Sequence, residues 1–425
     1  MADAPRRRQP DRPRRLAFDA LRAVNADGAY ANLVLAKLLT ERGLTGRDAA
    51  FATELVAGTC RLQGGYDTII AAAAGRSLST LQPAAVDLLR LGAHQILSMR
   101  VPTHAAVGAM VDLAAATVGE RLTGLVNAVL RKVAARDLEG WLESLSAGLD
   151  DLDRLALMTA HPRWIVEAYA DRLPADELET ALHADNDSPA VTLVVRPGLT
   201  EVDDLVRAGA EPALHSPFAA RWTGNPAELD AVRSGRAGVQ DEGSQLVALA
   251  LSRAEAEPGW WLDLASGPGG KTALLTGLAA ADGSTVLAAE LAPHRAALVV
   301  AACRAYDKPP TVVVADGTVP AWRTRSFTRV LADVPCSGLG ALRRRPESRW
   351  RRGAEVVEEL HPLQLALLAS ALEAAAPGGV VAYVTCSPHR RETEDVVTET
   401  LNGRDDVSVI PAGELLPELV NATRG

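Results

Sequence analysis

The second half of the chain alternates short apolar segments with longer helical patterns, and this alternation restricts the possible folds more than any other feature. Five strand-like segments follow residue 238, with helix-like stretches between most of them: Trp260–Leu264, Thr285–Glu290, Thr311–Asp316, Arg329–Asp333 and Gly379–Cys386. Strands that alternate with helices form βαβ units, in which neighbouring strands run parallel. We therefore expect an α/β domain with a Rossmann-like parallel sheet, whose strands end at one ligand-binding edge.

The front of the chain has a different pattern. Leu16 and Leu21 recur at helical spacing, as do the apolar residues of segments 86–91 and 125–130. We expect an all-α domain here, then a mixed segment in which residues 191–197 form a strand ended by proline. The chain should thus consist of a basic flexible tail, an all-α domain, a small α+β linker domain and the α/β domain. These parts span, in order, residues 1–13, 14–138, 139–236 and 237–425.

Charge limits the partners that the chain can have. The formal net charge is −9, so the whole molecule is not a general binder of polyanions. Contact with nucleic acid must therefore come from local basic patches. One such patch is the N-terminal segment from Arg6 to Arg15, which is either a disordered tail or an arm that contacts phosphates. This segment lacks an apolar core, so it is not a secretory signal.

The four cysteines, Cys60, Cys303, Cys336 and Cys386, are too widely spaced for a disulfide framework or a zinc site. They fit a reducing cytosol, and we expect a cytoplasmic protein without a metal. Cys60 and Cys303 are interpreted as buried apolar residues. The sequence contains no run of about 18 uncharged apolar residues, so no membrane span is expected.

The other two cysteines lie in short motifs that directly follow predicted strands. Cys336 belongs to the segment Asp333–Gly338, and Cys386 belongs to Thr385–Ser387. In a parallel sheet both would reach the carboxyl edge, where open α/β folds bind ligands. Two thiols at one such edge suggest a reaction that needs a soft nucleophile and a helper. The alternative is that both are buried small apolar residues.

A glycine-rich turn links the first predicted strand of the sheet to the first helix. Glycines let a backbone approach a ligand closely, and a helix N-terminus offers free N–H groups. Three ligand classes compete for this turn. A P-loop would need glycine at position 265, where alanine stands, and a dinucleotide fingerprint would need glycine at 272, where threonine stands. The third class is a nucleoside cofactor without a phosphate chain, such as S-adenosylmethionine. The residues expected to bind the cofactor are Ala265, Ser266, Gly267, Pro268, Gly269, Gly270 and Lys271.

Acidic residues at the strand ends favour the third class. Glu290 lies about 20 residues after the glycine turn, where a carboxylate meets ribose hydroxyls in nucleotide-binding βαβ units. Asp263, Asp316 and Asp333 end three further strands. A single acid of this kind is commonly a helix cap or part of a solvated turn. Four acids at four successive strand ends indicate a site, and we expect Glu290, Asp316 and Asp333 to bind the cofactor.

Together these motifs resemble the NOL1/NOP2/Sun family of RNA cytosine-5 methyltransferases. The front half is similar to the NusB-like RNA-binding domain, and this combination is similar to the bacterial Sun (Fmu) type that acts on 16S ribosomal RNA. The loop departs from the family's usual Cys-Ala-Ala at Ala265–Gly267, and the chain reaches Gly425 without the apolar strand that closes the family's sheet. The segments that carry the resemblance are 124–131, 238–246, 265–272, 333–338, 343–347 with Trp350, and 385–387.

The resemblance implies methylation of carbon 5 of an rRNA cytosine by S-adenosylmethionine, through a covalent adduct between cysteine and carbon 6. Cys386 is implied to be the nucleophile and Cys336 the helper in product release, because a thiolate can both attack and leave. If burial raises the pKa of Asp333 so that it is protonated, this carboxylic acid would supply the hydrogen bond or proton at N3 that accepts the negative charge developing there. Lys271 would lie near the substrate or hold the loop. We expect a monomer whose partner is ribosomal RNA, with no membrane and no metal.

Arginines after the first cysteine motif form a local basic cluster that comprises Arg343, Arg344, Arg345, Arg349, Arg351 and Arg352. Contact with RNA phosphates is expected here, and a solvated loop is the alternative. Two other functions compete with the methyltransferase. A non-catalytic RNA-binding module conflicts with the intact pair of cysteine motifs, and a P-loop ATPase would be revealed by nucleotide titration.

Overall fold

The computed structural model describes residues 10–419, which form two compact units. The helical unit contains the described residues up to Ser188 together with Leu339–Glu355. The sheet unit contains Pro189–Gly338 and the described residues from Val356 onward. The chain therefore enters the helical unit twice.

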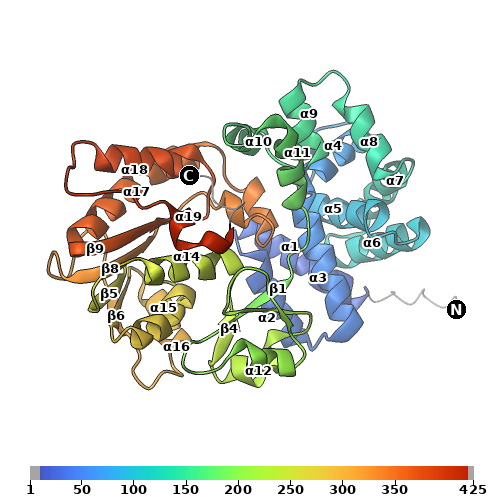
Figure 1. The fold of residues 1–425 in the computed structure, drawn as a ribbon. Helices are drawn as coiled ribbons and strands as arrows, with labels where there is room; N and C mark the ends of the chain where they lie inside the picture. Colours follow the sequence, from blue (N-terminus) through green and yellow to red (C-terminus); the bar gives the residue numbers. More distant parts are fainter. Residues whose placement is uncertain (1–9, 420–425) are drawn as a thin grey trace, which may run out of the picture. The chain divides into compact units, whose positions relative to one another are not determined.

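The helical unit is built from amphipathic helices around an apolar core that includes Leu16, Leu21 and Ile69 (Figure 1). Asp11 caps the first helix by accepting a hydrogen bond from the Arg14 N–H, and a proline stands in its first turn. The predicted all-α fold of this part is confirmed. Its α-helices are α1 (Arg12–Ala26), α2 (Ala31–Arg42), α3 (Gly46–Arg61), α4 (Gln63–Ala74), α5 (Pro83–Leu97), α6 (Thr103–Thr117), α7 (Thr123–Val133), α8 (Leu138–Ser146), α9 (Asp151–Met158), α10 (Arg163–Ala170) and α11 (Ala175–Ala184).

The sheet unit contains the predicted parallel sheet, with the strand order β7-β6-β5-β8-β9. Each of the five predicted segments forms a strand, and only the ends differ from the prediction. The strands are β5 (Trp260–Asp263), β6 (Thr285–Glu290), β7 (Thr311–Val314), β8 (Phe327–Asp333) and β9 (Ala375–Val384). The predicted α/β fold is therefore confirmed.

Helices cover both faces of this sheet, because successive side chains of a strand point to opposite faces. Trp261 packs in one apolar cluster with Leu274, and Leu262 packs in another with Leu367. The helices of this part are α14 (Glu242–Arg253), α15 (Gly270–Ala281), α16 (Pro293–Ala302), α17 (Glu355–Ala374), α18 (Glu394–Leu401) and α19 (Ala412–Leu415) (Figure 1).

A smaller antiparallel sheet precedes the parallel one within the sheet unit. Its strand order is β2-β3-β1-β4, and the side chain of Gln245 on α14 donates to the Leu193 carbonyl of its central strand β1 at 3.3 Å. The elements of this part are β1 (Val191–Val195), α12 (Val202–Arg207), β2 (Glu211–Pro212), β3 (Ala219–Trp222), α13 (Asp230–Arg233) and β4 (Ala237–Val239).

The two units divide the chain differently from the four predicted segments. The predicted linker, residues 139–236, is split after Ser188, because α8 to α11 pack in the helical unit and β1 begins the sheet unit. Of the predicted tail, residues 1–9 lie outside the described residues, whereas Arg12 and Pro13 belong to α1.

Residues 339–355, which we predicted to belong to the α/β domain, pack in the helical unit instead. Arg349 is only 1% exposed, although it lies in an arginine-rich segment. Its guanidinium donates to the Ala160 carbonyl at 2.9 Å and to the side-chain oxygen of Asn186 at 2.8 Å. The indole N–H of Trp350 donates to the carbonyl of Cys60 at 2.7 Å. These bonds anchor the segment among helices that lie far away in the sequence.

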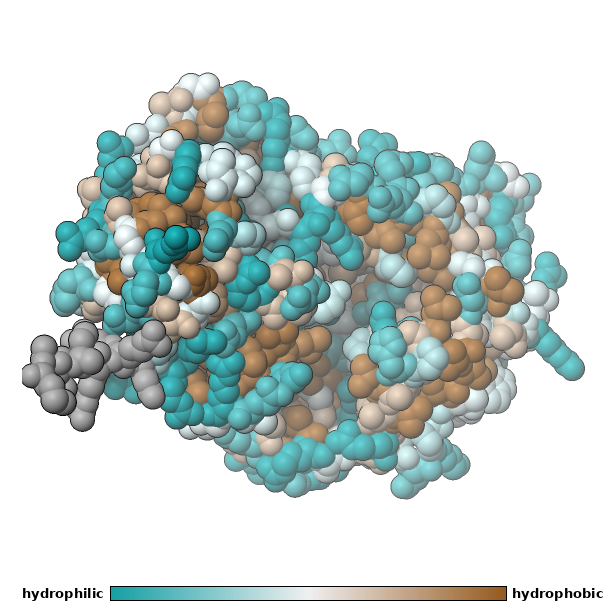
Figure 2. Space-filling model, turned by 180° about the vertical axis from the view of Figure 1, so that it is seen from behind, coloured by the Kyte–Doolittle hydropathy of each residue, from teal (hydrophilic) through white to brown (hydrophobic). Residues whose placement is uncertain are grey.

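No helix within residues 10–419 combines the length and the apolar composition that a membrane span requires. In Figure 2 the exposed hydrophobic residues form several separate patches with hydrophilic side chains between them. Individual large apolar side chains on the surface are common in folded proteins and need no partner to explain them.

Candidate active site

Cys336 and Cys386 come together at the carboxyl edge of the parallel sheet. They follow the neighbouring strands β8 and β9, whose register pairs Asp333 with Val384. The N–H of Val334 continues this pairing by donating to the carbonyl of Val384 at 2.9 Å. The two sulfur atoms are 3.3 Å apart, so the two thiols can share a hydrogen bond. The sequence placed both cysteines at this edge, and the strand register brings them into contact.

The contact between the sulfurs changes how the pair ionises. A hydrogen bond from the Cys386 thiol lowers the pKa of Cys336 to about 7, and the same bond raises the pKa of Cys386. The pair therefore loses its first proton near neutral pH and holds its second proton firmly. The negative charge then lies on Cys336, while Cys386 keeps the remaining proton and can pass it to Cys336 across the contact. Cys386 is the exposed member, which makes it the sulfur that a nucleic-acid base can reach.

Lys271 and Asp333 form an ion pair beside the cysteines. The ammonium of Lys271 lies 2.7 Å from Oδ2 of Asp333, and the side chains are 18% and 30% exposed. Lys271 also lowers the pKa of Cys386, and Asp333 raises it, so both charges act on the exposed thiol. The pair therefore places an ammonium donor and a carboxyl acceptor next to the exposed thiol.

The glycine-rich turn is tightly enclosed by its surroundings. A Cβ atom on Gly267 would lie 2.2 Å from Oε2 of Glu290, and one on Gly269 would lie 2.7 Å from the Cα of Val299. Gly269 also has a φ of 99°, which L side chains rarely adopt. Only glycine therefore fits position 269, whereas a side chain at 267 would displace the carboxylate of Glu290. Helix α15 begins directly after these two residues.

Contacts at the start of α15 argue against a P-loop. In a P-loop the lysine reaches the phosphates and the hydroxyl residue that follows it binds magnesium. Here Lys271 is bound to Asp333, and the hydroxyl of Thr272 donates to Oδ2 of Asp263 at 2.6 Å.

Three acids lie near the turn in different states. The carboxylate of Glu290 accepts the N–H of Gly267 on Oε2 at 2.9 Å and the N–H of Ala292 on Oε1 at 3.0 Å. The guanidinium of Arg295 lies 3.5 Å from Oε2, so Oε1 is the oxygen with a lone pair left for a ligand. Burial raises the pKa of Asp263 to about 7, and its Oδ1 atom is buried without a hydrogen-bond partner. Asp316 is exposed in the turn after β7, and hydrogen bonds from Thr318 lower its pKa.

A buried carboxylate that the sequence did not indicate joins the two cysteine motifs. Glu392 is fully buried and accepts the N–H of Ser337 at 2.7 Å. The amide of Gln364, from α17, donates to the same carboxylate at 3.1 Å. Glu392 stands between arginine and threonine in a polar segment, so nothing in the local pattern indicates burial.

The predicted RNA-binding arginine cluster is wrong for two of its members. Arg349 is buried as described above, and the guanidinium of Arg351 donates to the Val24 carbonyl at 3.3 Å and lies over the ring of Tyr30. These two side chains hold residues 339–355 in the helical unit and cannot reach RNA. Arg343, Arg345 and Arg352 are exposed.

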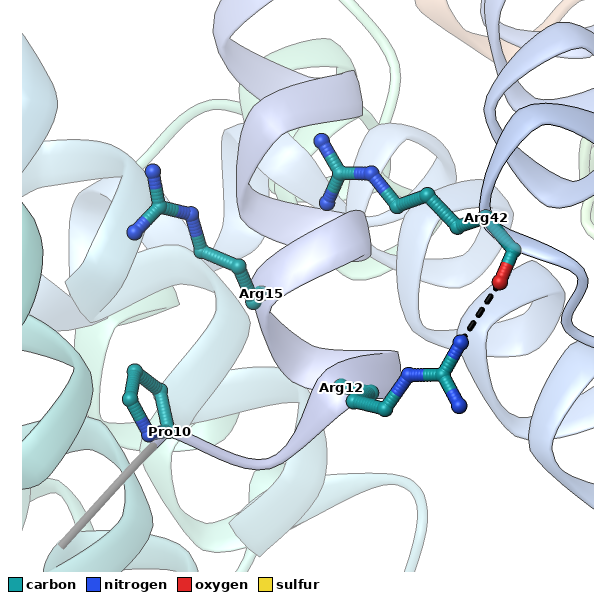
Figure 3. Close-up of a pocket in the computed structure, with 4 residues that line it drawn as sticks. All are labelled: Pro10, Arg12, Arg15 and Arg42. Atoms are coloured by element: carbon teal, nitrogen blue, oxygen red, sulfur yellow. Dashed lines mark hydrogen bonds between the residues drawn. The ribbon is translucent and has the colours of Figure 1, made fainter.

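A second group of arginines lines an open pocket near the start of α1 (Figure 3). Arg12 donates to the carbonyl of Arg42, while Arg15 and Arg42 both pair with Asp19, at 3.1 and 2.7 Å. One carboxylate is shared by two of the three cations, so the pocket keeps a positive charge. Among residues 10–419 no group of three or more histidine, cysteine or acidic side chains is placed to hold a metal ion.

Known proteins resemble both parts of the chain. A family model described as 16S rRNA methyltransferase RsmB/F matches residues 248–421, and the NusB family model matches residues 11–135. A Mycobacterium tuberculosis (strain CDC 1551 / Oshkosh) protein named as methyltransferase MT1451 is 49% identical over 93% of this chain and 88% of that protein. Ribosomal RNA small subunit methyltransferase B of Erwinia tasmaniensis is 29% identical over 88% of this chain and 87% of that protein.

The fold has a solved counterpart as well. The crystal structure of PH0851 has a TM-score of 0.76 at 20% identity, and the match covers 93% of this chain and 90% of that chain. This likeness concerns the fold, whereas the sequence relatives cover both the helical front part and the α/β part. The chain therefore belongs to the family of RsmB/F 16S rRNA methyltransferases, an S-adenosylmethionine-dependent class, and carries a NusB-family domain at its front.

Proposed function

We propose that this protein methylates carbon 5 of a cytosine in small-subunit ribosomal RNA. The observation that supports this most strongly is the pair of sulfur atoms, 3.3 Å apart, beside the Lys271–Asp333 ion pair. Carbon 5 of cytosine is a poor nucleophile until a thiolate adds to carbon 6. A reaction of this kind needs one sulfur that attacks, a group that handles its proton, and a cation near the base.

The residues around the glycine turn fit S-adenosylmethionine. The turn presents backbone close to a ligand, Oε1 of Glu290 keeps a lone pair for a ribose hydroxyl, and the buried Oδ1 of Asp263 lacks a donor. Ala265–Lys271, Glu290 and Asp316 would hold the cofactor, and Asp333 would lie between it and the base. When bound, S-adenosylmethionine supplies an electrophilic methyl group.

The cysteines would act in sequence. The ionised Cys336 takes the proton of the Cys386 thiol as the Cys386 sulfur forms a bond to carbon 6, and the electrons of the 5,6 double bond move toward carbon 5. The Lys271 ammonium stabilises the negative charge that develops on the ring, while Asp333 accepts a hydrogen bond from the base. After methylation, a base removes the carbon 5 proton and the double bond re-forms. The bond to Cys386 breaks, and Cys336 donates its proton to the departing sulfur.

The arginine pocket of the helical unit supports a role in binding the RNA backbone. Arg12, Arg15 and Arg42 present a local positive charge on a chain whose net charge is −9, and phosphates are the commonest nucleic-acid ligand of arginine. Changing Arg15 and Arg42 together to alanine should weaken RNA binding and reduce its dependence on salt. Arg207→Ala, an exposed change in the sheet unit, is the matched control.

Bisulfite sequencing of ribosomal RNA tests the reaction directly. A strain without this protein should lose one or more 5-methylcytosines from its small-subunit rRNA. The intact protein should restore them, and the Cys386→Ala variant should not. Unchanged methylation in the deletion strain, or full restoration by Cys386→Ala, would contradict the proposed function.

A further inference from the structure

Glu392 is the only fully buried carboxylate in the segment that follows the second cysteine motif, among the residues that the structure describes. Its neighbours Arg390 and Arg391 do not neutralise it, because Arg390 pairs with Glu394 and Arg391 with Glu399. Burying a charge is costly unless hydrogen bonds replace the lost water. The position of Glu392 therefore calls for an explanation in terms of the groups that it binds.

The donors to Glu392 come from the residue next to Cys336. The backbone N–H of Ser337 donates to Oε1 at 2.7 Å, and the hydroxyl of Ser337 donates to Oε2. Gln364 donates both to Oε1 at 3.1 Å and to the carbonyl of Pro335 at 2.9 Å. The residues on both sides of Cys336 are thus fixed by one carboxylate and its amide partner.

The same group reaches the second motif. The hydroxyl oxygens of Ser337 and Ser387 lie 3.1 Å apart, and Ser387 directly follows Cys386. The Tyr383 hydroxyl, from the end of β9, donates to the backbone carbonyl of Glu392 at 2.8 Å. Glu392 therefore lies at the centre of a network that connects the loops of both cysteines.

We propose that Glu392 is a positioning residue that holds the sulfur of Cys336 within hydrogen-bonding distance of Cys386. This inference rests on the proposed function for the roles of the two cysteines. The pairing of β8 with β9 ends at Asp333 and Val384, and Val334 makes a further backbone bond to β9. Beyond Val334 the bonds to Glu392 help to set the course of the loop. Without the carboxylate, the Ser337 N–H and hydroxyl lose their acceptors and the loop is free to move away from β9.

Two possible effects of Glu392 on the thiols have opposite signs. The negative charge of Glu392 raises the pKa of Cys336, so a purely electrostatic role predicts that its removal makes the pair ionise at lower pH. A positioning role predicts the reverse, because a pair that moves apart loses the hydrogen bond that lowers the pKa of Cys336. The other charged groups that face the pair, Lys271 and Asp333, stay in place in both cases.

The test is the pH dependence of alkylation of Glu392→Gln by iodoacetamide, with the modified residue identified by mass spectrometry. Cys60 and Cys303 do not interfere near neutral pH, because burial raises their pKa values to about 12 and about 11. We expect the pH midpoint of alkylation of the cysteine pair to rise by about one pH unit or more, which makes the reaction at pH 7 at least about fivefold slower. An unchanged or lower midpoint would overturn the inference.

Further variants separate positioning from loss of folding. Glu392→Asp keeps the charge and should recover part of the reactivity, whereas Ser337→Ala removes one donor and should shift the midpoint in the same direction by a smaller amount. Glu394→Gln, which alters a half-exposed carboxylate two residues away, should behave like the native protein. If Glu392→Gln does not fold, Ser337→Ala decides, and an unshifted midpoint in that variant overturns the inference.

Methylation assays distinguish this inference from the proposed function. If Cys386→Ala abolishes methylation while Glu392→Gln matches the native protein in both assays, the function stands and the positioning role fails. If Cys386→Ala still methylates RNA, the proposed function fails whatever the thiol titration shows.

Discussion

Replacing Cys336 by alanine should raise the pH at which the protein attacks its RNA. In the native pair the sulfurs are 3.3 Å apart, and the bond between them lowers the pKa of Cys336 from 9.0 to about 7. Without Cys336, the thiol of Cys386 has no partner sulfur, and Lys271 and Asp333 act on its pKa in opposite directions. Burial still raises this pKa, so it should be at least about 9, the ordinary value of a thiol.

The size of the effect follows from this shift. Two pH units correspond to about 2.7 kcal/mol of differential stabilisation of the thiolate. The thiolate is the attacking form, so the rate rises with pH through the pKa. At pH 7 the ionised fraction falls from about one half to about one hundredth, and attack should be slower by roughly 50-fold. The difference in rate between the native protein and Cys336→Ala should shrink as the pH rises toward about 10.

A single-turnover assay measures this prediction. Labelled rRNA and S-adenosylmethionine are mixed with excess protein between about pH 6 and 10, and RNA-linked protein is separated on a denaturing gel. In Cys336→Ala the adduct should also persist, because the proton donor for the departing sulfur is missing. Cys386→Ala should give no adduct at any pH. If the pH midpoint of adduct formation does not move in Cys336→Ala, the two sulfurs do not share a proton. If Cys386→Ala alone forms an adduct, the roles of the two cysteines are reversed.

Three further changes test other parts of the structure. Glu290→Ala should weaken binding of S-adenosylmethionine by about 1–3 kcal/mol through loss of charged hydrogen bonds; calorimetry measures this, and equal affinity would remove Glu290 from the cofactor site. Asp263→Asn should stabilise the protein more at pH 8 than at pH 5, by about 2.6 kcal/mol, because the folded pKa of about 7 exceeds 3.8 and native stability falls as pH rises between these values. Urea unfolding checks it, and equal gains at both pH values would contradict it. Arg349→Ala should lower the free energy of unfolding by about 2–4 kcal/mol, since buried carbonyls lose their donor; exposed Arg343→Ala is the control, and a similarly small effect of both changes would show that Arg349 does not anchor its segment.

The sequence was most informative about residues that directly follow a predicted strand. Cys336 and Cys386 could be placed at one edge because each directly follows an apolar strand, and parallel strands share their carboxyl edge. The contact between the sulfurs could not be predicted, since it depends on β8 and β9 being neighbours in a fixed register. The order of motifs along the sequence does not determine which strands are neighbours in the sheet.

Buried charge was the main feature that the sequence concealed. Glu392 and Arg349 both lie in segments rich in charged residues, which normally form solvated surface. Their partners, such as Gln364 for Glu392 and Ala160 for Arg349, come from distant parts of the chain. Only the tertiary structure creates these environments, so local patterns favour the wrong, exposed interpretation.

The path of residues 339–355 makes the protein resistant to dissection into its halves. The chain passes between the units at Ser188–Pro189, at Gly338–Leu339 and again at Glu355–Val356. A fragment that begins at Pro189 would carry Arg349 and the apolar residue Leu342 without the helices that bury them. Such a fragment should aggregate, so the two halves cannot be exchanged freely between homologous proteins. A functional hybrid would have to inherit residues 339–355 from the same parent as its helical half.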